Sequence, residues 1–353
     1  MDLQGWMDQG RAMDCTDLHL TVGLPVVARM LGELTIIGDE PLTKEEIHAM
    51  LGTVMNRAQQ EEYQKGDLDF GFQDAHGYSV RVNAYYQKGN PCAALRLLRN
   101  TIPTFDDLMI PEAVRKLSTL PRGLVLVTGP TGSGKSTTMA AMINSISHSR
   151  KAHIITIEDP IEVLHRHQQS IVSQREIGQD TPDYIHALTA ALREAPDVIL
   201  VGEMRDLETL QTVLSAAETG HLVFSSLHTT GAANTINRII DVFPAEKQQQ
   251  IRVQLSMVLQ AIVSQQLVPA VGGGLIPAFE IMKVNNAVQT QIRENKIHQI
   301  DNTIQANARD GMVTMDVSLL SLLKAGRITK ETALLACSDP DLMRKRLAAT
   351  NLI

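Results

Sequence analysis

The sequence is poor in aromatic residues: its 353 residues include one Trp, five Tyr and six Phe. Any large core therefore has to be built from Leu, Ile, Val, Met and Ala, a composition that suits packed helices. Hydrophobic residues make up 44% of the chain, which is ordinary for a globular protein with a real core. At roughly 100–200 residues per domain, this length predicts two domains.

Cysteine and long apolar runs are also scarce. The three cysteines, Cys15, Cys92 and Cys337, are far apart and form no CxxC pair, which excludes a zinc module and a disulfide framework. The start, MDLQGWMDQGR, has no apolar segment of a signal peptide, and no apolar run approaches the roughly 18 residues that span a bilayer. We expect a cytoplasmic protein that reaches the inner face of a membrane only through a partner.

Positive charge is not in excess, because 32 Lys and Arg residues against 39 Asp and Glu residues give a formal net charge of −7. A protein that coats nucleic acid needs a basic surface. The charge therefore predicts no nucleic-acid partner, although it leaves room for a ring with a local basic channel.

The first hundred residues predict a small α+β domain at 1–99. Strands are expected at 17–21, 26–31, 34–37, 68–72, 78–86 and 93–98. Thr43 to Glu46 form a capping-box pattern that predicts a helix through about Asn56.

A linker is expected at 100–112, where Pro103 and Pro111 stiffen the chain, and a second domain at 113–353. In this domain apolar runs at 123–128, 153–157, 198–201 and 222–226 alternate with helical segments, which predicts a mainly parallel sheet covered by helices. Beyond Ala245 we expect a mostly helical chain, broken by Pro269, three glycines at 272–274 and Pro277.

One segment fits the phosphate-loop pattern GxxxxGK[ST] completely and lies between an apolar strand and a helix. Glycines let backbone N–H groups wrap phosphates, Lys135 would reach the β- and γ-phosphates of ATP, and Ser136 would give its hydroxyl to Mg²⁺. The predicted nucleotide-binding residues are Gly129, Pro130, Thr131, Gly132, Ser133, Gly134, Lys135, Ser136 and Thr137.

Hydrolysis also needs a group that orients the attacking water. Glu203 follows the buried strand 198–201, and a carboxylate at that position is suited to this role. Glu158 and Glu162 follow the strand 153–157 and would lie near Mg²⁺ or the water; otherwise this acidic segment is a solvated turn.

His221 and His228 bracket the strand 222–226 and could sense the γ-phosphate. A single histidine is more often a satisfied or exposed ring. No HExxH spacing occurs here, which argues against a metalloenzyme.

Four blocks in a fixed order resemble the type II/type IV secretion ATPase superfamily, and within it the pilus retraction ATPases. They are GPTGSGKSTT (129–138), TIEDPIEVLH (156–165), APDVILVGEMRD (195–206) and TGHLVFSSLHTTGAANTINRIIDVFP (219–244). CTDLHL (15–20) and YSVRVNAY (78–85) extend the resemblance to nearly the whole chain.

The resemblance implies a PAS-like N-terminal domain joined to a RecA-like ATPase domain, assembled as a homohexamer on a pilus platform protein of the inner membrane. It implies that Glu203 is the catalytic carboxylate, that Glu162 assists it and that His228 belongs to the family's His box. Arg81 and Arg96 match arginines that reach a neighbouring subunit's nucleotide; from the sequence alone each is more readily an exposed strand residue.

Other functions stay open. Relatives for pilus extension or type II secretion usually carry an extra N-terminal domain and a tetracysteine zinc module, so retraction is favoured. Ser225-Ser226 replaces the family's usual Gly-Thr, a small change that should be tolerated. The family's AIRNLIRE segment appears here as AVQTQIRE (287–294), so an accessory pilus motor is an alternative. A DNA-translocating ATPase and a scaffold that binds ATP without hydrolysing it are opposed by the charge and by the intact motifs.

Overall fold

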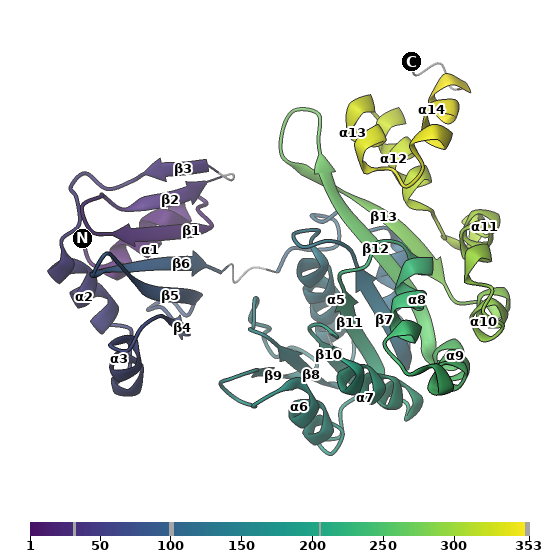
Figure 1. The fold of residues 1–353 in the computed structure, drawn as a ribbon, viewed down its shortest axis with the longest axis horizontal. Helices are drawn as coiled ribbons and strands as arrows, with labels where there is room; N and C mark the ends of the chain where they lie inside the picture. The colour runs from purple at the N-terminus through teal and green to yellow at the C-terminus, as the bar shows by residue number, and fades with distance from the viewer. Residues whose placement is uncertain (31–32, 99–101, 205, 350–353) are drawn as a thin grey trace. The chain divides into compact units, whose positions relative to one another are not determined.

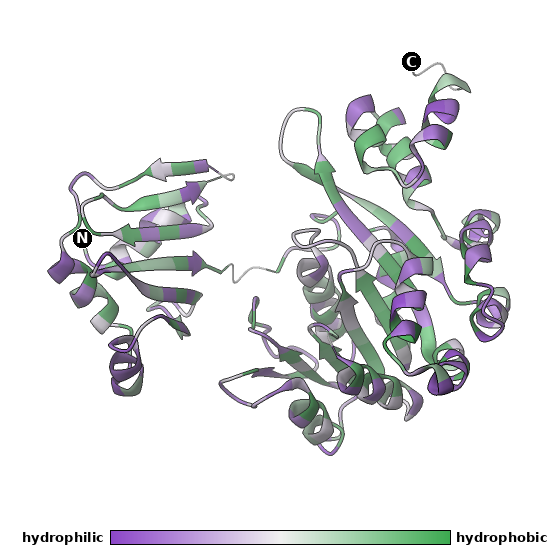
Figure 2. Ribbon diagram, in the orientation of Figure 1, coloured by the Kyte–Doolittle hydropathy of each residue, from purple (hydrophilic) through white to green (hydrophobic). Residues whose placement is uncertain are grey.

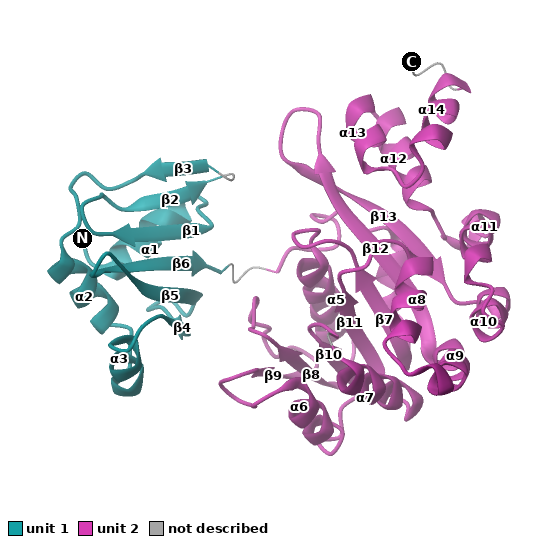
Figure 3. Cartoon of the chain, in the orientation of Figure 1, with its two compact units in different colours: residues 1–101 teal, residues 102–353 magenta. Residues whose placement is uncertain are grey.

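The computed structural model describes residues 1–30, 33–98, 102–204 and 206–349. The chain divides into two compact units, Met1–Thr101 and Ile102–Ile353, which Figure 3 shows in two colours. The beginning of the linker predicted at 100–112 lies outside the described residues. Its later part packs on the second unit, since Ile110 is buried there and Phe105 and Leu108 pack beside it.

The first unit is built on a six-stranded antiparallel sheet with the order β3-β2-β1-β6-β5-β4 (Figure 1). Its strands are β1 (Asp17–Thr21), β2 (Val27–Met30), β3 (Glu33–Ile36), β4 (Leu68–Gln73), β5 (Ser79–Gln87) and β6 (Asn90–Leu97). Its helices are α1 (Leu3–Ala12), α2 (Lys44–Gly52) and α3 (Arg57–Tyr63). All six predicted strands are present; β1 has the predicted ends, and the ends of the others differ by at most three residues.

Alternation along the strands gives this sheet one buried face, as a period of two requires. Leu18 and Leu20 of β1 are buried with Leu95 of β6 in one core with residues of α1 and α2. Thr43 caps α2 through the expected capping box, but the helix ends at Gly52 rather than near Asn56. Asn56 and Gln59 form a second capping box that opens α3, a signal that was missed in the sequence.

The second unit contains a seven-stranded sheet with the order β13-β12-β7-β11-β10-β8-β9. All neighbours are parallel except β12 and β13. The strands are β7 (Gly123–Thr128), β8 (His153–Glu158), β9 (Ile171–Glu176), β10 (Val198–Val201), β11 (Leu222–Leu227), β12 (Leu259–Pro269) and β13 (Leu275–Lys283). Figure 2 shows its inner strands β7, β10 and β11 as mostly hydrophobic.

The expectation of a mostly helical chain beyond Ala245 was wrong for residues 259–283. They form the antiparallel hairpin of β12 and β13, and the three glycines at 272–274 lie in its loop. Pro277 was read as a break, but it lies in β13, the strand at the edge of the sheet, where proline costs least. The apolar run 261–263 was too short to separate helix from strand by periodicity.

Helices cover both faces of this sheet. They are α4 (Glu112–Arg115), α5 (Lys135–Ser149), α6 (Tyr184–Ala191), α7 (Leu207–Glu218), α8 (Ala232–Asp241), α9 (Ala245–Val258), α10 (Asn286–Arg293), α11 (Ile300–Ala306), α12 (Met315–Lys324), α13 (Lys330–Ala336) and α14 (Pro340–Ala349). No helix in the described part of the chain is long and apolar enough to cross a membrane.

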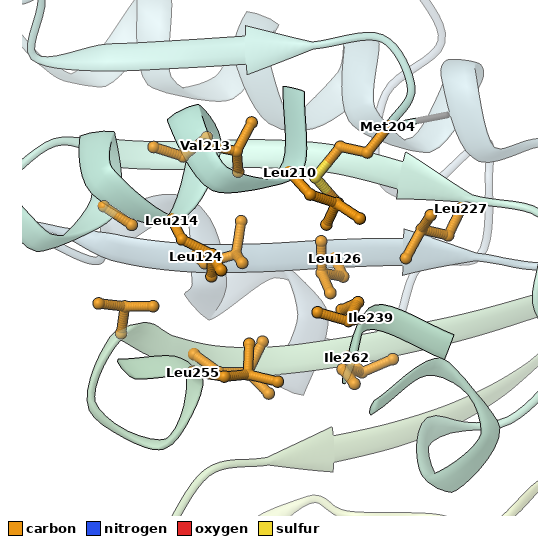
Figure 4. Close-up of a cluster of buried hydrophobic side chains, with 14 of the residues drawn as sticks. Leu124, Leu126, Met204, Leu210, Val213, Leu214, Leu227, Ile239, Leu255 and Ile262 are labelled. Atoms are coloured by element: carbon orange, nitrogen blue, oxygen red, sulfur yellow. The ribbon is translucent and has the colours of Figure 1, made fainter. Parts of the chain in front are cut away.

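Strand β7 separates two hydrophobic cores. Leu124 and Leu126 point to one side, among residues of α7, α8 and α9 (Figure 4), while Val125 and Val127 point to the other, where α5 packs. Both faces of this strand are therefore covered, as its unbroken apolar run predicts. The expected fold class, an α/β domain with a smaller α+β domain before it, is confirmed.

Candidate functional site

Residues 129–134 join the end of β7 to the start of α5, which is the connection that the sequence pattern predicts. Gly134 is the N-cap of α5, with φ of 86°, and no side chain caps this helix. The first N–H groups of α5 and the positive end of its dipole are therefore available to an anion at this end.

Gln265 of β12 supports the predicted phosphate loop from behind. A Cβ at Gly129 would lie 2.2 Å from the backbone O of Gln265, and a Cβ at Gly134 would lie 2.8 Å from its Nε2. The hydroxyl of Thr138 in α5 donates to Gln265 Oε1 at 2.7 Å. Two of the loop glycines are thus required by close approach as well as by positive φ. Gln265 was not predicted as a site residue, because its segment was expected to be helical.

Lys135 is held inside the loop that carries it. Its Nζ donates to the carbonyl oxygens of Gly129 at 2.9 Å and Pro130 at 3.0 Å. Burial lowers the pKa of the Lys135 amine, and the negative charges of Glu203 and Glu162 oppose that shift. Two carboxylates thus act on the lysine whose predicted role is to bind phosphate.

Glu203 follows β10 at the same end of the sheet. Its neighbour Gly202 is held on both sides, because its N–H donates to Ile157 O at 2.8 Å and its carbonyl accepts from the Ser226 hydroxyl at 2.6 Å. The side chain of Glu203 is only 14% exposed. Parallel strands bring their carboxyl ends to one edge, which is why the ends of β7, β10 and β11 meet here.

His228, directly after β11, joins two of these segments. Its Nε2 lies 3.3 Å from Glu203 Oε2, and its Nδ1 lies 3.5 Å from the Thr131 hydroxyl. One imidazole therefore bridges the predicted catalytic carboxylate and the predicted phosphate loop.

The acidic segment after β8 divides into a buried and an exposed carboxylate. Glu158 accepts hydrogen bonds from Thr156 at 2.7 Å and Gln174 at 3.2 Å. Burial raises the pKa of the Glu158 carboxyl, although these two hydrogen bonds act to lower it. Glu162 is exposed and acts electrostatically on Lys135, which makes it the more accessible of the two to a ligand.

His221 was grouped with His228 as a possible γ-phosphate sensor, and that placement was wrong. His221 precedes β11, whereas the phosphate loop follows β7. Because these strands are parallel, His221 lies at the amino ends of the strands, and the phosphate loop lies at their carboxyl ends. Its Nδ1 lies 2.9 Å from Ala216 O and 3.2 Å from the Thr219 hydroxyl. It therefore lies at the end of α7.

A pocket of about 420 Å³ brings eight of the predicted residues of the second unit together, while Gly129, Pro130, Ser133, Gly134 and Thr137 do not line it. Its lining also includes Tyr184 and His165, which the sequence did not single out as site residues. The predicted residues that line the pocket are Thr131, Gly132, Lys135, Ser136, Glu158, Glu162, Glu203 and His228.

Oxygen donors dominate the part of this pocket near the predicted loop. Ser136, Glu162 and Glu203 supply a hydroxyl and carboxylates, the ligand types that Mg²⁺ prefers. No cluster of three or more metal-binding side chains occurs among the described residues. That combination fits Mg²⁺, which is usually held by one or two protein groups together with phosphates and water.

Arg81 and Arg96 lie in the first unit, directly opposite each other on β5 and β6. They point away from the hydrophobic core of that unit, since their strand neighbours Val80 and Leu95 are buried in it. Arg96 is paired with Asp17 at 2.9 Å, while the buried Nε of Arg81 has no hydrogen-bond partner within the described residues. Like charges opposed on neighbouring strands are unfavourable, so this pair suits a face that meets an anion.

The geometry of the pocket and the similarity to known proteins together identify the chain as a nucleotide-binding ATPase with an α/β core. The profile of the family described as Type II/IV secretion system protein matches residues 48–308, so the chain belongs to this family.

Within the family, the chain is 44% identical to the type IV pilus retraction ATPase PilT of Pseudomonas aeruginosa over 334 residues, 94% of this chain and 97% of that protein. It is 48% identical to a twitching motility protein of Neisseria gonorrhoeae over 86% of this chain and 82% of that one. The crystal structure of the pilus retraction motor PilT with bound ADP matches with a TM-score of 0.92 and 44% identity, over 98% of this chain and 99% of that one.

Proposed function

We propose that this chain is a motor subunit that hydrolyses Mg-ATP to drive the retraction of type IV pili. The observation that carries the proposal is the meeting of Lys135, Glu203 and His228 in one pocket, in a chain similar to a retraction ATPase over nearly the full length of both.

ATP would bind with its phosphates in the loop 129–136. The N–H groups of the loop and of the start of α5 would bind the β- and γ-phosphates. Lys135 would exchange the carbonyl oxygens of Gly129 and Pro130 for phosphate oxygens. Ser136 and Glu162 would hold Mg²⁺, which would offset the negative charge of the phosphates.

Glu203 would orient a water molecule for attack on the γ-phosphorus and accept its proton. The bond between the γ-phosphorus and the bridging oxygen breaks, and ADP leaves with that oxygen. His228, at 3.3 Å, would keep the Glu203 carboxylate aimed at this water.

We further propose a ring, most simply a homohexamer, in which Arg81 and Arg96 of one subunit approach the nucleotide of the next. Arg81 on β5 supports this, because it faces Arg96, which already pairs with Asp17, and its buried Nε has no hydrogen-bond partner within the described residues. An arginine supplied by a neighbour stabilises transition-state charge and links hydrolysis to subunit geometry. The ring would act on a platform protein in the membrane.

The decisive experiment is a deletion of the gene in its own organism. Cells with many surface pili and no twitching, restored by the parent gene but not by Glu203→Gln, would support the proposal. Cells without pili would point to extension instead. An accessory motor is the second candidate, because the chain is also 38% identical to the type IV pilus ATPase PilU of Pseudomonas aeruginosa; it predicts that retraction persists at reduced force.

A further inference from the structure

Glu280 is a buried carboxylate that the proposed chemistry does not use. It lies in the middle of β13, directly opposite Ser264 of β12, and is 6% exposed. Burial raises the pKa of its carboxyl, and repulsion from Asp301 and Asp316 adds to the shift, while two backbone hydrogen bonds oppose it. A buried carboxylate is costly, so its partners should explain why it is there.

Those partners are the first residues of two helices. Glu280 Oε1 accepts from the N–H of Ala232, which begins α8, at 2.7 Å. Its Oε2 accepts from the N–H of Met315, which begins α12, at 3.3 Å. The N-cap residues of these helices, Gly231 and Thr314, make no side-chain cap of their own. One carboxylate therefore caps two helices that belong to distant parts of the sequence.

The helix α8 directly follows the loop that carries His228. Gly231 in that loop donates its N–H to the Ser264 hydroxyl at 3.0 Å. The hydroxyls of Thr229 and Thr235 lie 2.7 Å apart, and Thr235 also donates to Gly231 O at 2.8 Å. The loop is thus fixed to α8 and to β12, and a shift at the start of α8 is passed to His228.

The helix α12 begins the C-terminal helical bundle, which has its own core. Met315 and Leu319 of α12 are buried there with Ala333 of α13 and Met343 of α14. Glu280 therefore contacts both this bundle and the segment that leads into the nucleotide pocket.

We propose that Glu280 is a positioning residue: by capping α8 and α12 together, it holds the His228 loop in register with Glu203 and couples that loop to the C-terminal helical bundle. The inference rests on the proposed catalytic roles of Glu203 and His228.

The test compares Glu280→Gln with a matched control, Asp316→Asn. The glutamine has the same shape but presents an NH₂ group to one of the two N–H donors, so one helix start loses its acceptor. Asp316 is also a buried carboxylate, and it accepts a hydrogen bond from the backbone N–H of Ser338 at 2.7 Å. Both residues of this contact belong to the C-terminal helical bundle. Both variants should melt at a lower temperature.

The two variants should differ in catalysis. Glu280→Gln should lower kcat about tenfold with KM for ATP changed by less than about twofold, because a misplaced catalytic pair slows turnover without removing a binding contact. Asp316→Asn should keep kcat near that of the parent. Equal kcat values for the two variants at matched stability would overturn the proposal.

Amide hydrogen exchange without nucleotide separates this proposal from the proposed function, because it does not depend on hydrolysis. In Glu280→Ala, which removes both acceptor oxygens, exchange should become faster at the starts of both α8 and α12, since one carboxylate holds both. If Glu280→Gln does not fold, Ser264→Ala removes the neighbouring acceptor for Gly231 and should lower kcat in the same sense. Unchanged exchange at α8, or unchanged kcat in Ser264→Ala, would contradict the coupling.

Discussion

His228 Nε2 lies 3.3 Å from Glu203 Oε2, although the two residues are 25 positions apart and follow different strands. The contact exists because β10 and β11 are parallel neighbours and end at the same edge of the sheet. Glu203 is mostly buried and His228 is 55% exposed, so the histidine covers the carboxylate on the open side of the pocket.

This pair predicts that Glu203→Gln and His228→Asn affect turnover and leave nucleotide binding largely intact. Glu203→Gln should lower kcat by about 100-fold or more, since it removes the group that orients and deprotonates water. His228→Asn should have a smaller effect, about tenfold, because it acts through Glu203. Binding of a fluorescent ATP analogue and steady-state hydrolysis would measure the two effects. A Glu203→Gln enzyme with parental turnover would remove Glu203 from this role.

Lys135→Ala, unlike Glu203→Gln, should weaken nucleotide binding. We expect nucleotide affinity to fall at least about tenfold, because charge-assisted bonds to phosphate are lost. Fold stability without nucleotide should fall by about 1 kcal/mol, since the carbonyls of Gly129 and Pro130 lose their donor. Lys151→Ala is the control, because Lys151 is exposed beyond the end of α5. Titration calorimetry would measure affinity, and urea unfolding would measure stability.

Two glycines of the same loop should respond differently to alanine. Gly132 has φ of 78° and no atom near its missing Cβ, so Gly132→Ala should cost about 1–2 kcal/mol of stability without nucleotide. Gly129→Ala adds a contact of 2.2 Å with the backbone of Gln265 and should cost clearly more. Urea unfolding of both variants would measure this difference. Equal losses of stability in the two variants would mean that β12 shifts to make room for the new methyl group.

The opposed arginines predict composite active sites. Arg81→Ala and Arg96→Ala should each lower ATPase activity at least about tenfold in assembled rings. Arg57→Ala in the same unit should leave activity unchanged, because its exposed side chain pairs with Glu61. Mixing Arg81→Ala subunits with Lys135→Ala subunits should recover activity, since some interfaces would then hold an intact Lys135 and an intact Arg81. No recovery on mixing would contradict a role across the interface.

His165 predicts a loss of stability in mild acid. Burial lowers the pKa of its imidazole to about 4, against 6.5 for the free side chain. Between these values the unfolded chain binds a proton that the folded chain does not, so stability falls as the pH falls. The expected contribution is about 2 kcal/mol between pH 7 and pH 5. The free energy of unfolding of His165→Gln, measured beside the parent at both pH values, should show a weaker pH dependence by that amount.

Helices and strands were predicted correctly from the sequence where the local hydrophobic pattern of a segment agrees with its burial in the fold. The apolar run at 123–128 is buried on both faces, and that requirement is visible in its composition. By contrast, β12 and β13 contain polar residues that serve buried contacts, such as Gln265 against the loop glycines and Glu280 beneath two helices. These residues hide the strand pattern, because their partners are distant in sequence.

The candidate site divides in the same way. The spacing of 129–136 and the strand before Glu203 placed Glu203 and four loop residues, Thr131, Gly132, Lys135 and Ser136, in the site, and all five line the pocket. His221 was misplaced because a strand has two ends and only the carboxyl end faces the pocket. Tyr184 and His165 line the pocket from segments that carry no phosphate-binding pattern.

The two-sided burial of β7 has a mechanical consequence. Since Leu124 and Leu126 are clamped by one core and Val125 and Val127 by another, this strand cannot slide or tilt without opening both. The phosphate loop at the end of β7 is thus held in a fixed position by this strand. Any power stroke must come from the segments that close against it.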